Sequence, residues 1–500
     1  MTMDSSLNAA RRARELGEVR ERVVDVLVVG LGATGAGAAL DAASRGLSVA
    51  AIDAYDLAFG TSRWSSKLIH GGLRYLARGQ VGVAKESAVE RGVLLRHTAP
   101  HLVQAHPYLL AMTPRVSRTQ ARLAMTGYRL GDALRTAAGT PRRLLPGPSR
   151  IPAERALDLV PSLDPEGLRG ALLSWDGRVV DDARLVVAIA RTAAAHGARV
   201  LTRCRALALT GDSGLVRDEL TGEEFTIRAK AVVNATGVWA GGLVPEVELR
   251  PSRGTHLVLR PGTLGPLKAG LHVPIPDAGN RFALVLPQLD GRVYVGLTDE
   301  PLDGPVPEVP EAPESDVSFL LDVLGSVLAT PVRRDQVAGA YAGLRPLLAG
   351  GGGTADLSRR HAVLRSPDGV VTVVGGKLTT YRRMAEDAID ATGLPAPRSS
   401  TARLPLVGAA RSGDGLPPRL VRRYGSEAAA VQDLGAREPE LRRPVIDGQP
   451  TTLAELVWAV RHEGALVPDD LLDRRTRIGL IPEDRAAALP TAEAAFGISE

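Results

Sequence analysis

Aromatic residues and cysteine are scarce in this chain of 500 residues. Phenylalanine, tryptophan and tyrosine together make up 3% of the sequence, and Cys204 is its one cysteine. A single cysteine excludes a disulfide framework and a cysteine-rich metal site. Nucleic-acid-binding proteins usually combine basic blocks with aromatic residues that stack on bases, so the formal charge of +5 gives little support to that class.

Long apolar runs are missing too. The longest uncharged apolar stretch, residues 26–40, is rich in glycine and alanine and is too short to cross a bilayer. The N-terminal residues before it carry no apolar segment of the kind found in signal peptides. These features predict a cytoplasmic protein, either free or bound to a membrane surface.

Lysine is the third scarce residue. Most of the 61 basic residues are arginines, and the lysines are Lys67, Lys85, Lys230, Lys268 and Lys377. We attribute the bias toward arginine, alanine and glycine to genomic base composition. A lysine inside a motif is therefore more informative than an arginine.

The N-terminal hundred residues contain a predicted βαβ unit. A β-branched, apolar strand at Val23–Val29 is followed by a helix at Gly35–Arg45 and a second strand at Ser48–Ile52. The first strand is apolar throughout, as a strand buried on both faces must be. A parallel pair joined by a helix is typical of nucleotide-binding folds.

Glycines 30, 32 and 35 form a GxGxxG turn in this unit. Gly30 allows a tight turn, Gly32 lets a pyrophosphate approach the backbone, and Gly35 lets the helix pack closely. The helix N-terminus offers free N–H groups to phosphates, and Asp53, at the end of the second strand, suits ribose hydroxyls. The alternative is an ordinary glycine-rich turn, which would not require Asp53.

Two later segments favour FAD over a nicotinamide cofactor. Residues 232–240 run from a strand into a turn at Gly237, and residues 373–390 run through Gly376 into a helix that starts near Thr379. A nicotinamide enzyme needs one such unit per cofactor, whereas a two-part flavin fold brings several separated segments to one FAD. The last helix would point its N-terminus at the flavin, where it stabilises the anionic reduced ring.

The chain resembles the FAD-dependent, respiratory glycerol-3-phosphate dehydrogenases, which are close relatives of the glycerol-3-phosphate oxidases. The resemblance covers about residues 22–480, and its motifs include GTSRWSSKLIHGGLRYL, VVNATGVWA, RGTHLVL, AGLRPL, SRRH and GGKLTTYRRMAEDAID. Asp53 stands where the family usually has glutamate, and Trp64 where a small residue is often found. Residues 349–354, AGGGGT, replace a more polar loop.

This resemblance implies an α/β fold with three parts. The FAD-binding part would be Rossmann-like, of the two-dinucleotide-binding type shared by D-amino-acid oxidase and glutathione reductase. An antiparallel-sheet substrate domain and a C-terminal helical domain would complete it. The expected division is a polar N-terminal tail or one frayed helix at 1–22, an FAD-binding domain at 23–106, 175–247 and 340–394, a substrate-binding domain at 107–174 and 248–339, and a helical domain at 400–500.

By resemblance, residues 60–72 run along non-covalently bound FAD. Hydroxyls and Lys67 of this loop would donate to the cofactor, and His70 with the two glycines after it would pass beside the flavin ring. The residues expected to bind FAD are Gly30, Gly32, Ala33, Thr34, Gly35, Asp53, Thr61, Ser65, Ser66, Lys67, His70, Gly71, Gly72, Gly237, Gly376, Leu378 and Thr379. No metal site is expected.

The resemblance also implies a site for glycerol 3-phosphate, a dianion with a secondary alcohol. Such a ligand needs fixed cations for its phosphate and a base for its C2 hydroxyl proton. His256 is the candidate base, and Arg345 is the alternative through its effect on the alcohol. The expected substrate contacts are Arg74, Tyr75, Arg345, Arg359 (or its neighbour Arg360) and Lys377. Competing interpretations are a surface ion pair for Arg74 and an ordinary sheet histidine for His256.

The implied function is FAD-dependent oxidation of sn-glycerol 3-phosphate to dihydroxyacetone phosphate. Hydride would pass from C2 to flavin N5, and electrons would pass on to a membrane quinone. The alternatives are an oxidase that uses oxygen, an amine-oxidising relative, and a catalytically silent dinucleotide-binding scaffold. A homodimer is left open.

Residues 114–150 are a candidate membrane patch. They hold eight arginines and a single acid, Asp132, with leucines, Met125 and Tyr128 between them. Positive charge beside exposed apolar side chains favours a headgroup region, and quinone stays in lipid. We therefore expect a peripheral protein on the inner face of the cell membrane. The alternative is a solvated arginine-rich loop.

Overall fold

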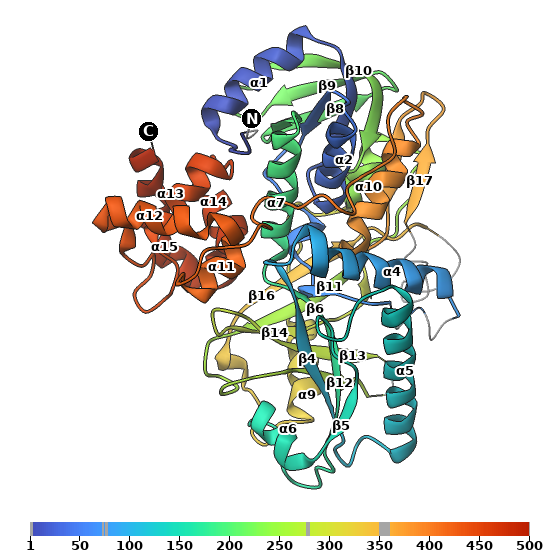
Figure 1. The fold of residues 1–500 in the computed structure, drawn as a ribbon, viewed down its shortest axis with the longest axis vertical. Coiled ribbons are helices and arrows are strands. Elements are labelled where there is room, and N and C mark those ends of the chain that lie inside the picture. Colours follow the sequence, from blue (N-terminus) through green and yellow to red (C-terminus); the bar gives the residue numbers. More distant parts are fainter. Residues whose placement is uncertain (1–3, 73–74, 76–78, 277–280, 350–360, 500) are drawn as a thin grey trace.

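The protein contains two sheets and a separate group of C-terminal helices. The structure, a computed structural model, describes residues 4–72, 75, 79–276, 281–349 and 361–499. In Figure 1 the two sheet-containing parts lie one above the other, and the helical part packs against one flank. A largely parallel sheet, a largely antiparallel sheet and a helical end match the predicted fold class.

The first sheet contains the predicted βαβ unit. Five parallel strands run in the order β18-β10-β1-β2-β7, and three antiparallel strands extend the sheet. The strands are β1 (Val24–Val29), β2 (Val49–Ile52), β7 (Arg199–Leu201), β8 (Cys204–Leu209), β9 (Ser213–Asp218), β10 (Glu224–Asn234), β17 (Ala362–Arg365) and β18 (Val371–Val374). Because β1 lies between β2 and β10 and runs parallel to both, their carboxyl ends meet at one edge of the sheet.

Three helices cover one face of this sheet. They are α2 (Ala33–Ser44), α7 (Asp182–Ala195) and α10 (Tyr381–Asp390), and they share a hydrophobic core with β1 and β2. α2 begins two residues before the prediction, and β1 and β2 each begin one residue after it. The βαβ prediction is therefore confirmed.

The N-terminal segment forms a docked helix, which corrects the predicted polar tail. α1 (Ala9–Glu21) buries apolar side chains against the other face of the first sheet. The buried Arg12 also donates to the Asp218 carboxylate at 2.6 Å and to the carbonyl oxygen of Thr202 at 2.8 Å. Polar composition predicted no more than a frayed helix here, because ionic contacts supply part of the attachment of α1.

The second sheet is mostly antiparallel, as expected for the substrate domain. Its main path is β15-β11-β14-β13-β12-β4-β6-β3, with β16 beside β11 and β5 beside β6. The strands are β3 (Leu68–Ile69), β4 (Val103–Ala111), β5 (Ser149–Ile151), β6 (Ala171–Val179), β11 (Ser252–Leu259), β12 (Gly270–Pro274), β13 (Phe282–Pro287), β14 (Val293–Gly296), β15 (Glu300–Pro301) and β16 (Val337–Arg345).

A long helix lies within the arginine-rich residues 114–150, for which a solvated loop was one of the two interpretations. α5 (Arg118–Ala137) begins with a capping box formed by Ser117 and Gln120. Its inner side packs on a small apolar cluster from β4 and β6, and its outer side exposes Leu123 and Leu130. Figure 1 shows this helix running along the outside of the lower part of the molecule.

The predicted domain boundaries cut through strands of the second sheet. The boundaries at 106/107, 174/175 and 339/340 fall inside β4, β6 and β16. The division into FAD-binding and substrate-binding parts stays a prediction, and we move its boundaries to the ends of these strands. The other helices of these parts are α4 (Val81–Val93), α6 (Ala153–Leu159), α8 (Ala240–Leu243) and α9 (Glu314–Gly325).

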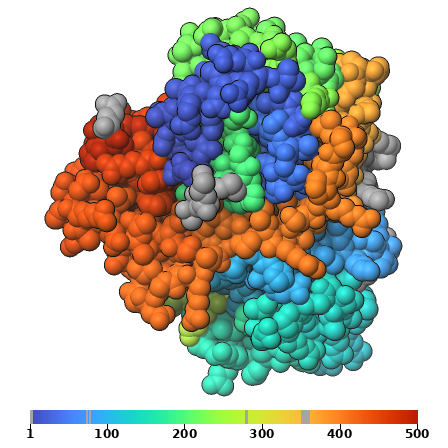
Figure 2. Space-filling view, turned by 45° about the horizontal axis from the view of Figure 1, so that its top comes forward, coloured from blue at the N-terminus to red at the C-terminus, as the bar shows by residue number. Residues whose placement is uncertain are grey.

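The C-terminal part is helical, as predicted, and has its own apolar core. Its helices are α11 (Pro418–Tyr424), α12 (Ala428–Arg437), α13 (Leu453–His462), α14 (Pro468–Asp470) and α15 (Pro482–Ser499). Leu7, near the other end of the chain, exchanges backbone hydrogen bonds with His462 and Gly464. Figure 2 shows these orange and red residues packed against the blue N-terminal ones.

The attachment of α1 predicts a specific loss of stability. Arg12→Met should lower the free energy of unfolding by about 3 kcal/mol, because it leaves the buried Asp218 carboxylate without its partner. Scanning calorimetry would record this as a lower melting temperature. Arg14→Met is the matched control, since Arg14 is 63% exposed and lies 3.9 Å from Glu18. Equal melting temperatures for the two variants would contradict a structural role for α1.

Candidate active site

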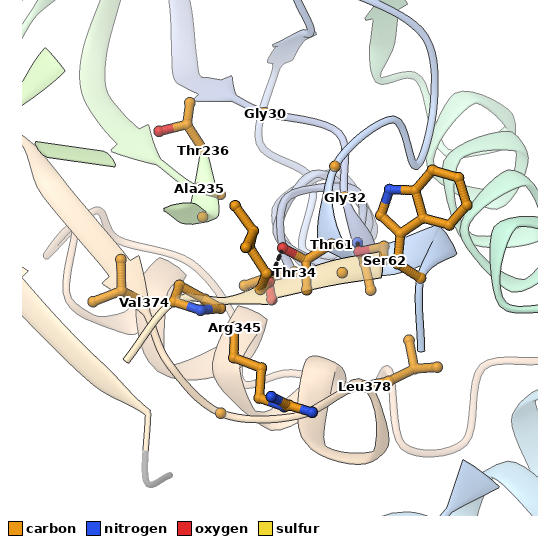
Figure 3. Close-up of a pocket in the computed structure, with 18 of the residues that line it drawn as sticks. Gly30, Gly32, Thr34, Thr61, Ser62, Ala235, Thr236, Arg345, Val374 and Leu378 are labelled. Carbon is orange, nitrogen blue, oxygen red and sulfur yellow. Dashed lines mark hydrogen bonds between the residues drawn. The ribbon is translucent and has the colours of Figure 1, made fainter. Parts of the chain in front are cut away.

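One cavity extends from the turn after β1 to the end of β16. Its volume is about 550 Å³, within the range of cofactor and substrate sites. The predicted residues that line it are Gly30, Gly32, Ala33, Thr34, Asp53, Thr61, Ser65, Ser66, His70, Gly237, His256, Arg345, Gly376, Lys377, Leu378 and Thr379. Figure 3 shows Gly30 and Gly32 on one side of the cavity and Arg345 on the other.

The GxGxxG turn has the geometry that its glycines predict. Gly30 has a φ of +97°, and a Cβ there would lie 2.7 Å from the carbonyl oxygen of Ala235. A Cβ on Gly35 would lie 1.7 Å from the Gly30 carbonyl oxygen, so this glycine packs α2 against the turn without lining the cavity. Gly32 is the N-cap of α2, and the first residues of that helix line the cavity. The positive end of the helix dipole therefore lies at the cavity wall.

Asp53 follows β2 and lines the same cavity. Its carboxylate accepts hydrogen bonds from the backbone N–H groups of Leu31 at 2.6 Å and Tyr55 at 2.9 Å. Burial raises the pKa of Asp53 to about 6, and these two donors only partly offset that effect. Each carboxylate oxygen keeps a further lone pair for a ligand hydroxyl.

Ser62 is a cavity residue that the sequence prediction missed. Its hydroxyl accepts a hydrogen bond from the N–H of Ala33 at 2.8 Å, which ties the loop after Gly60 to the start of α2. Its neighbour Thr61 donates to the carbonyl oxygen of Leu344 at 2.7 Å, so the same loop also holds β16. Figure 3 shows both side chains at the cavity. The several hydroxyl side chains close together in this segment could have indicated that Ser62 belongs to the site.

His256 lies on β11, at the junction of three strands. It stands opposite Tyr341 of β16 and Gly296 of β14, and its ring stacks on Tyr341 with centroids 4.8 Å apart. A Cβ on Gly296 would lie 2.2 Å from the imidazole, so this glycine makes room for the ring. The Nε2 atom is 3.0 Å from the Ser66 hydroxyl oxygen. Burial, helped by two nearby cations, lowers the pKa of His256 well below its usual value, so the ring is neutral.

Arg345, at the end of β16, is held from behind by contacts with described residues of β11 and of the segment after β14. Its Nη1 donates to the Ser252 hydroxyl at 3.0 Å and to the Asp299 carboxylate at 3.1 Å. Its Nη2 donates to the carbonyl oxygen of Thr298 at 3.2 Å. These contacts fix the guanidinium at the cavity wall, while buried Asp299 offsets part of its charge.

Lys377 follows the glycine pair after β18. Its ammonium donates to the Ser87 hydroxyl of α4 at 3.0 Å and lies 3.9 Å from the ring centroid of Tyr75. Tyr75 itself is buried and is not among the cavity-lining residues. The structure thus places Tyr75 against a cavity cation, whereas the sequence predicted it in the substrate pocket.

Lys67 lies in a different place from the one predicted. Its buried ammonium donates to Asp182 at 2.7 Å and to the carbonyl oxygens of Arg63 and Ser65, each at 3.0 Å. Its side chain does not line the cavity, because the buried carboxylate at the start of α7 draws the ammonium inward. Lys67 therefore holds the loop from within, and its charge helps to lower the pKa of His256.

Gly71 and Gly72 also lie outside the cavity wall, in contrast to the prediction. A Cβ on Gly71 would lie 2.3 Å from the Arg91 guanidinium, so this glycine makes room for that cation. Arg91 pairs with Asp176 at 2.6 Å, and Asp176 is 3.1 Å from Nδ1 of His70. Gly71 thus supports the position of His70, which does line the cavity.

Part of the predicted substrate site cannot be placed. Arg74, Arg359 and Arg360 lie outside the described residues. Cavity-lining residues that the sequence prediction did not include are more numerous, and among them are Tyr55, Phe59, Ser62, Trp64, Arg205, Thr236, Trp239 and Met384. Several of them reach the cavity through sheet pairing and helix packing, which no local motif records.

Comparison with known proteins decides the family. Residues 25–386 match the family of FAD-dependent oxidoreductases, and residues 399–497 match the C-terminal domain of alpha-glycerophosphate oxidase. Glycerol-3-phosphate dehydrogenase 1 of Mycobacterium tuberculosis is 51% identical, with 99% of each chain covered. The chain belongs to the FAD-dependent glycerol-3-phosphate dehydrogenase family.

Solved structures agree with the assignment of this dehydrogenase to the family. A glycerol-3-phosphate dehydrogenase from Bacillus halodurans complexed with FAD superposes with a TM-score of 0.74 and 28% identity, covering 98% of this chain and 94% of its own. L-α-glycerophosphate oxidase from Mycoplasma pneumoniae with FAD bound has the same fold, with a TM-score of 0.58 and 17% identity over 77% of this chain and 99% of its own. The predicted fold, family and FAD cofactor are confirmed.

The raised pKa of Asp53 predicts a pH dependence of FAD binding. In the FAD-free dehydrogenase, a pKa of about 6 means that most Asp53 side chains gain a proton as the pH falls from about 7 to about 5. If the ribose hydroxyls need the charged carboxylate, this proton must leave on binding, and the dissociation constant for FAD should rise about tenfold. Flavin fluorescence titrations of the FAD-free protein would measure it.

Asp53→Asn is the control variant for this titration. It should bind FAD more weakly than the parent at both pH values and show no further weakening at low pH, because the titrating group is gone. A parent dissociation constant that stays unchanged down to about pH 5 would contradict a ribose contact by charged Asp53.

Proposed function

We propose that His256, Arg345 and Lys377 act on sn-glycerol 3-phosphate in this dehydrogenase, which oxidises its C2 alcohol and passes the electrons to a membrane quinone. One observation carries the assignment: these three side chains line the same cavity as the GxGxxG turn. A scaffold without catalysis would not need them there. The product is dihydroxyacetone phosphate.

The chain's own residues suit FAD in this cavity. Gly30 lets the turn after β1 pack against the backbone of Ala235, and the start of α2, whose first residues line the cavity, directs N–H groups into it. Leu378 and Thr379 line the cavity just before α10, so the N-terminus of that helix is directed at the same space. When bound, FAD supplies the two-electron acceptor for the alcohol. Cys204 is buried and lies outside the cavity wall, which fits non-covalent binding.

Arg345 and Lys377 are the proposed phosphate cations. Both have fixed positions, Arg345 through Asp299 and Lys377 through Ser87, so little conformational freedom is lost when a dianion binds. Arginine can bind phosphate through two parallel N–H···O hydrogen bonds, and lysine adds a point charge. Arg345 also favours ionisation of a nearby alcohol, which is the alternative to a dominant role for the histidine.

His256 is the proposed acceptor of the C2 hydroxyl proton. The ring is neutral, which is the form that can accept a proton. Its Nε2 contacts the Ser66 hydroxyl, and its buried Nδ1 has no hydrogen-bond partner among the described residues. The stack on Tyr341 keeps the ring in one orientation.

The roles of these residues predict distinct kinetic effects. His256→Asn should slow flavin reduction by about 100-fold or more, with little change in the concentration of glycerol 3-phosphate needed for half-maximal rate. Lys377→Met should instead raise that concentration, since it removes a charge-assisted contact of about 1.5–3 kcal/mol. Anaerobic stopped-flow loss of the flavin absorption after addition of substrate measures both quantities.

Lys268→Met is the control, because Lys268 is 58% exposed and pairs with Asp158 on the surface. It should behave as the parent. Parental reduction rates in His256→Asn would assign proton removal elsewhere, with Arg345 as the leading group. A parent whose flavin is not reduced by glycerol 3-phosphate at all would overturn the proposed function.

The outer face of α5 is the proposed membrane patch. Within the described residues, Leu123 and Leu130 are 58% and 52% exposed, and the arginines beside them form no ion pair. These exposed arginines are Arg118, Arg122 and Arg129 on α5, and exposed Arg115 lies just before the helix. By contrast, Leu145 is buried and Arg142 pairs with Asp132 at 3.0 Å, so the end of the predicted segment contributes less. No described helix has the length and apolar character to span a bilayer.

Removing charge from this patch should weaken membrane binding. Each surface cation near anionic lipid contributes about 1 kcal/mol, so Arg122→Ser with Arg129→Ser should lower partitioning roughly 30-fold at low salt. Leu123→Ser with Leu130→Ser should weaken binding at low and high salt alike, since apolar burial is not screened. Flotation with anionic liposomes measures the partitioning.

The C-terminal pair Arg437→Ser with Arg443→Ser removes the same charge far from α5 and should float as the parent does. Activity with a lipid-embedded quinone should fall in the patch variants, while activity with a water-soluble acceptor stays unchanged. Full flotation and full quinone activity in both patch variants would place the membrane contact elsewhere. Unchanged turnover with oxygen as the sole acceptor would favour the oxidase alternative.

A further inference from the structure

The cavity loop after Gly60 rests on the C-terminal domain. The loop supplies Trp64, Ser65 and Ser66 to the cavity wall. Behind it lies residue Arg477, whose Nη2 donates to the carbonyl oxygen of Arg63 at 2.6 Å. A residue that belongs to the C-terminal domain by sequence therefore contacts the backbone of the cavity loop directly.

Trp64 is enclosed by cations and an aromatic ring. The guanidinium carbon of Arg63 lies 4.2 Å from the Trp64 ring centroid, and that of Arg477 lies 5.3 Å from it. The ring of Tyr341, which also stacks on His256, lies 5.5 Å from Trp64. Trp64 is thus the link between Arg477 and the stacked pair at the proposed catalytic position.

The loop is also pressed against β16. A Cβ on Gly343 would lie 2.5 Å from the Trp64 Cβ, so only glycine allows this approach. Gly343 stands two residues before Arg345 on the same strand. A shift of Trp64 would therefore be felt at the strand that carries Arg345.

Arg477 is held in a conformation that only surrounding contacts maintain. Its φ is +65°, in the left-handed region, which is unfavourable for residues other than glycine. Its Nη1 donates to the carbonyl oxygen of Asp473 at 3.0 Å, and its own carbonyl oxygen accepts from Arg292 at 2.8 Å. Leu480 and Ile481, just beyond it, pack in the same apolar cluster as Tyr341.

A buried ionic cluster anchors this segment to the first sheet. Arg475 donates through both Nη atoms to the two oxygens of Asp56, at 2.8 and 2.9 Å, and Arg474 donates to Asp56 at 2.6 Å. Asp56 lies only four residues before Gly60. Both ends of the contact are therefore fixed, and Arg477 has little freedom to move relative to the loop.

We propose that Arg477 is a positioning residue of the FAD site, by which the C-terminal domain fixes Trp64 and the adjoining serines in the cavity wall. The inference rests on FAD binding in this cavity and does not depend on the identity of the oxidised substrate. It gives the C-terminal domain a role in holding the cofactor, and it gives the unusual Trp64 a structural partner.

The test measures FAD affinity and the environment of bound flavin rather than turnover. Arg477→Met should raise the dissociation constant for FAD about tenfold, as measured by fluorescence titration of the FAD-free protein. At saturating FAD it should also change the visible circular dichroism of the flavin, because the wall around it has shifted. Arg443→Met, an exposed change in the same domain, should match the parent in both measurements.

A double-mutant cycle identifies Trp64 as the intermediate. Trp64→Phe should weaken FAD binding in the same direction, and adding Arg477→Met to it should cost much less than it costs in the parent. Fully additive effects would overturn action through Trp64, and parental values in Arg477→Met would overturn the proposal entirely. If Arg477→Met does not fold, Trp64→Phe decides alone, since parental affinity and dichroism in that variant also overturn it. If the parent binds FAD normally but does not oxidise glycerol 3-phosphate, the result counts against the proposed substrate and leaves the role of Arg477 standing.

Discussion

Parallel pairing of β1 with both β2 and β10 is the constraint on which the site depends. It aligns the carboxyl ends of three strands, so the turn at Gly30, the carboxylate of Asp53 and the loop after Asn234 reach the same edge of the sheet. β18 joins the same edge through β10 and brings Lys377 with it. Sheet pairing therefore brings residues more than 300 positions apart to one cavity, and no long loop is needed to reach it.

The register of the second sheet brings the proposed catalytic residues to the cavity. β11 pairs with β14 and β16, so His256 faces Tyr341 on one side and the space above Gly296 on the other. The same pairing carries Arg345 to the cavity, two residues after Gly343. Burial keeps the histidine neutral, while a backing carboxylate holds the arginine in place. The cavity therefore combines a neutral proton acceptor with fixed positive charge.

The βαβ unit was predictable because its signals are local: a β-branched run, spaced glycines and a terminal acid. Motifs also predicted many residues that line the cavity, whereas Lys67 lies outside its wall because its partner Asp182 is 115 residues away in sequence. α5 was missed although its capping box, Ser117 with Gln120, is visible in the sequence, because arginines obscure the apolar period. The docking of α1 was not predictable for a related reason, since part of its attachment is the ion pair between Arg12 and Asp218.

The pairing of Asp56 with Arg474 has a consequence for synthesis of the chain. The two residues are separated by 418 positions, and both are buried in the finished protein. At about 5–20 residues per second, a ribosome needs roughly 20 to 80 s to add the second after the first. During that interval the Asp56 carboxylate has no arginine partner. The surface of the FAD-binding part that later contacts the C-terminal part stays exposed to water. A domain that leaves the ribosome late is thus the one that closes a part made early.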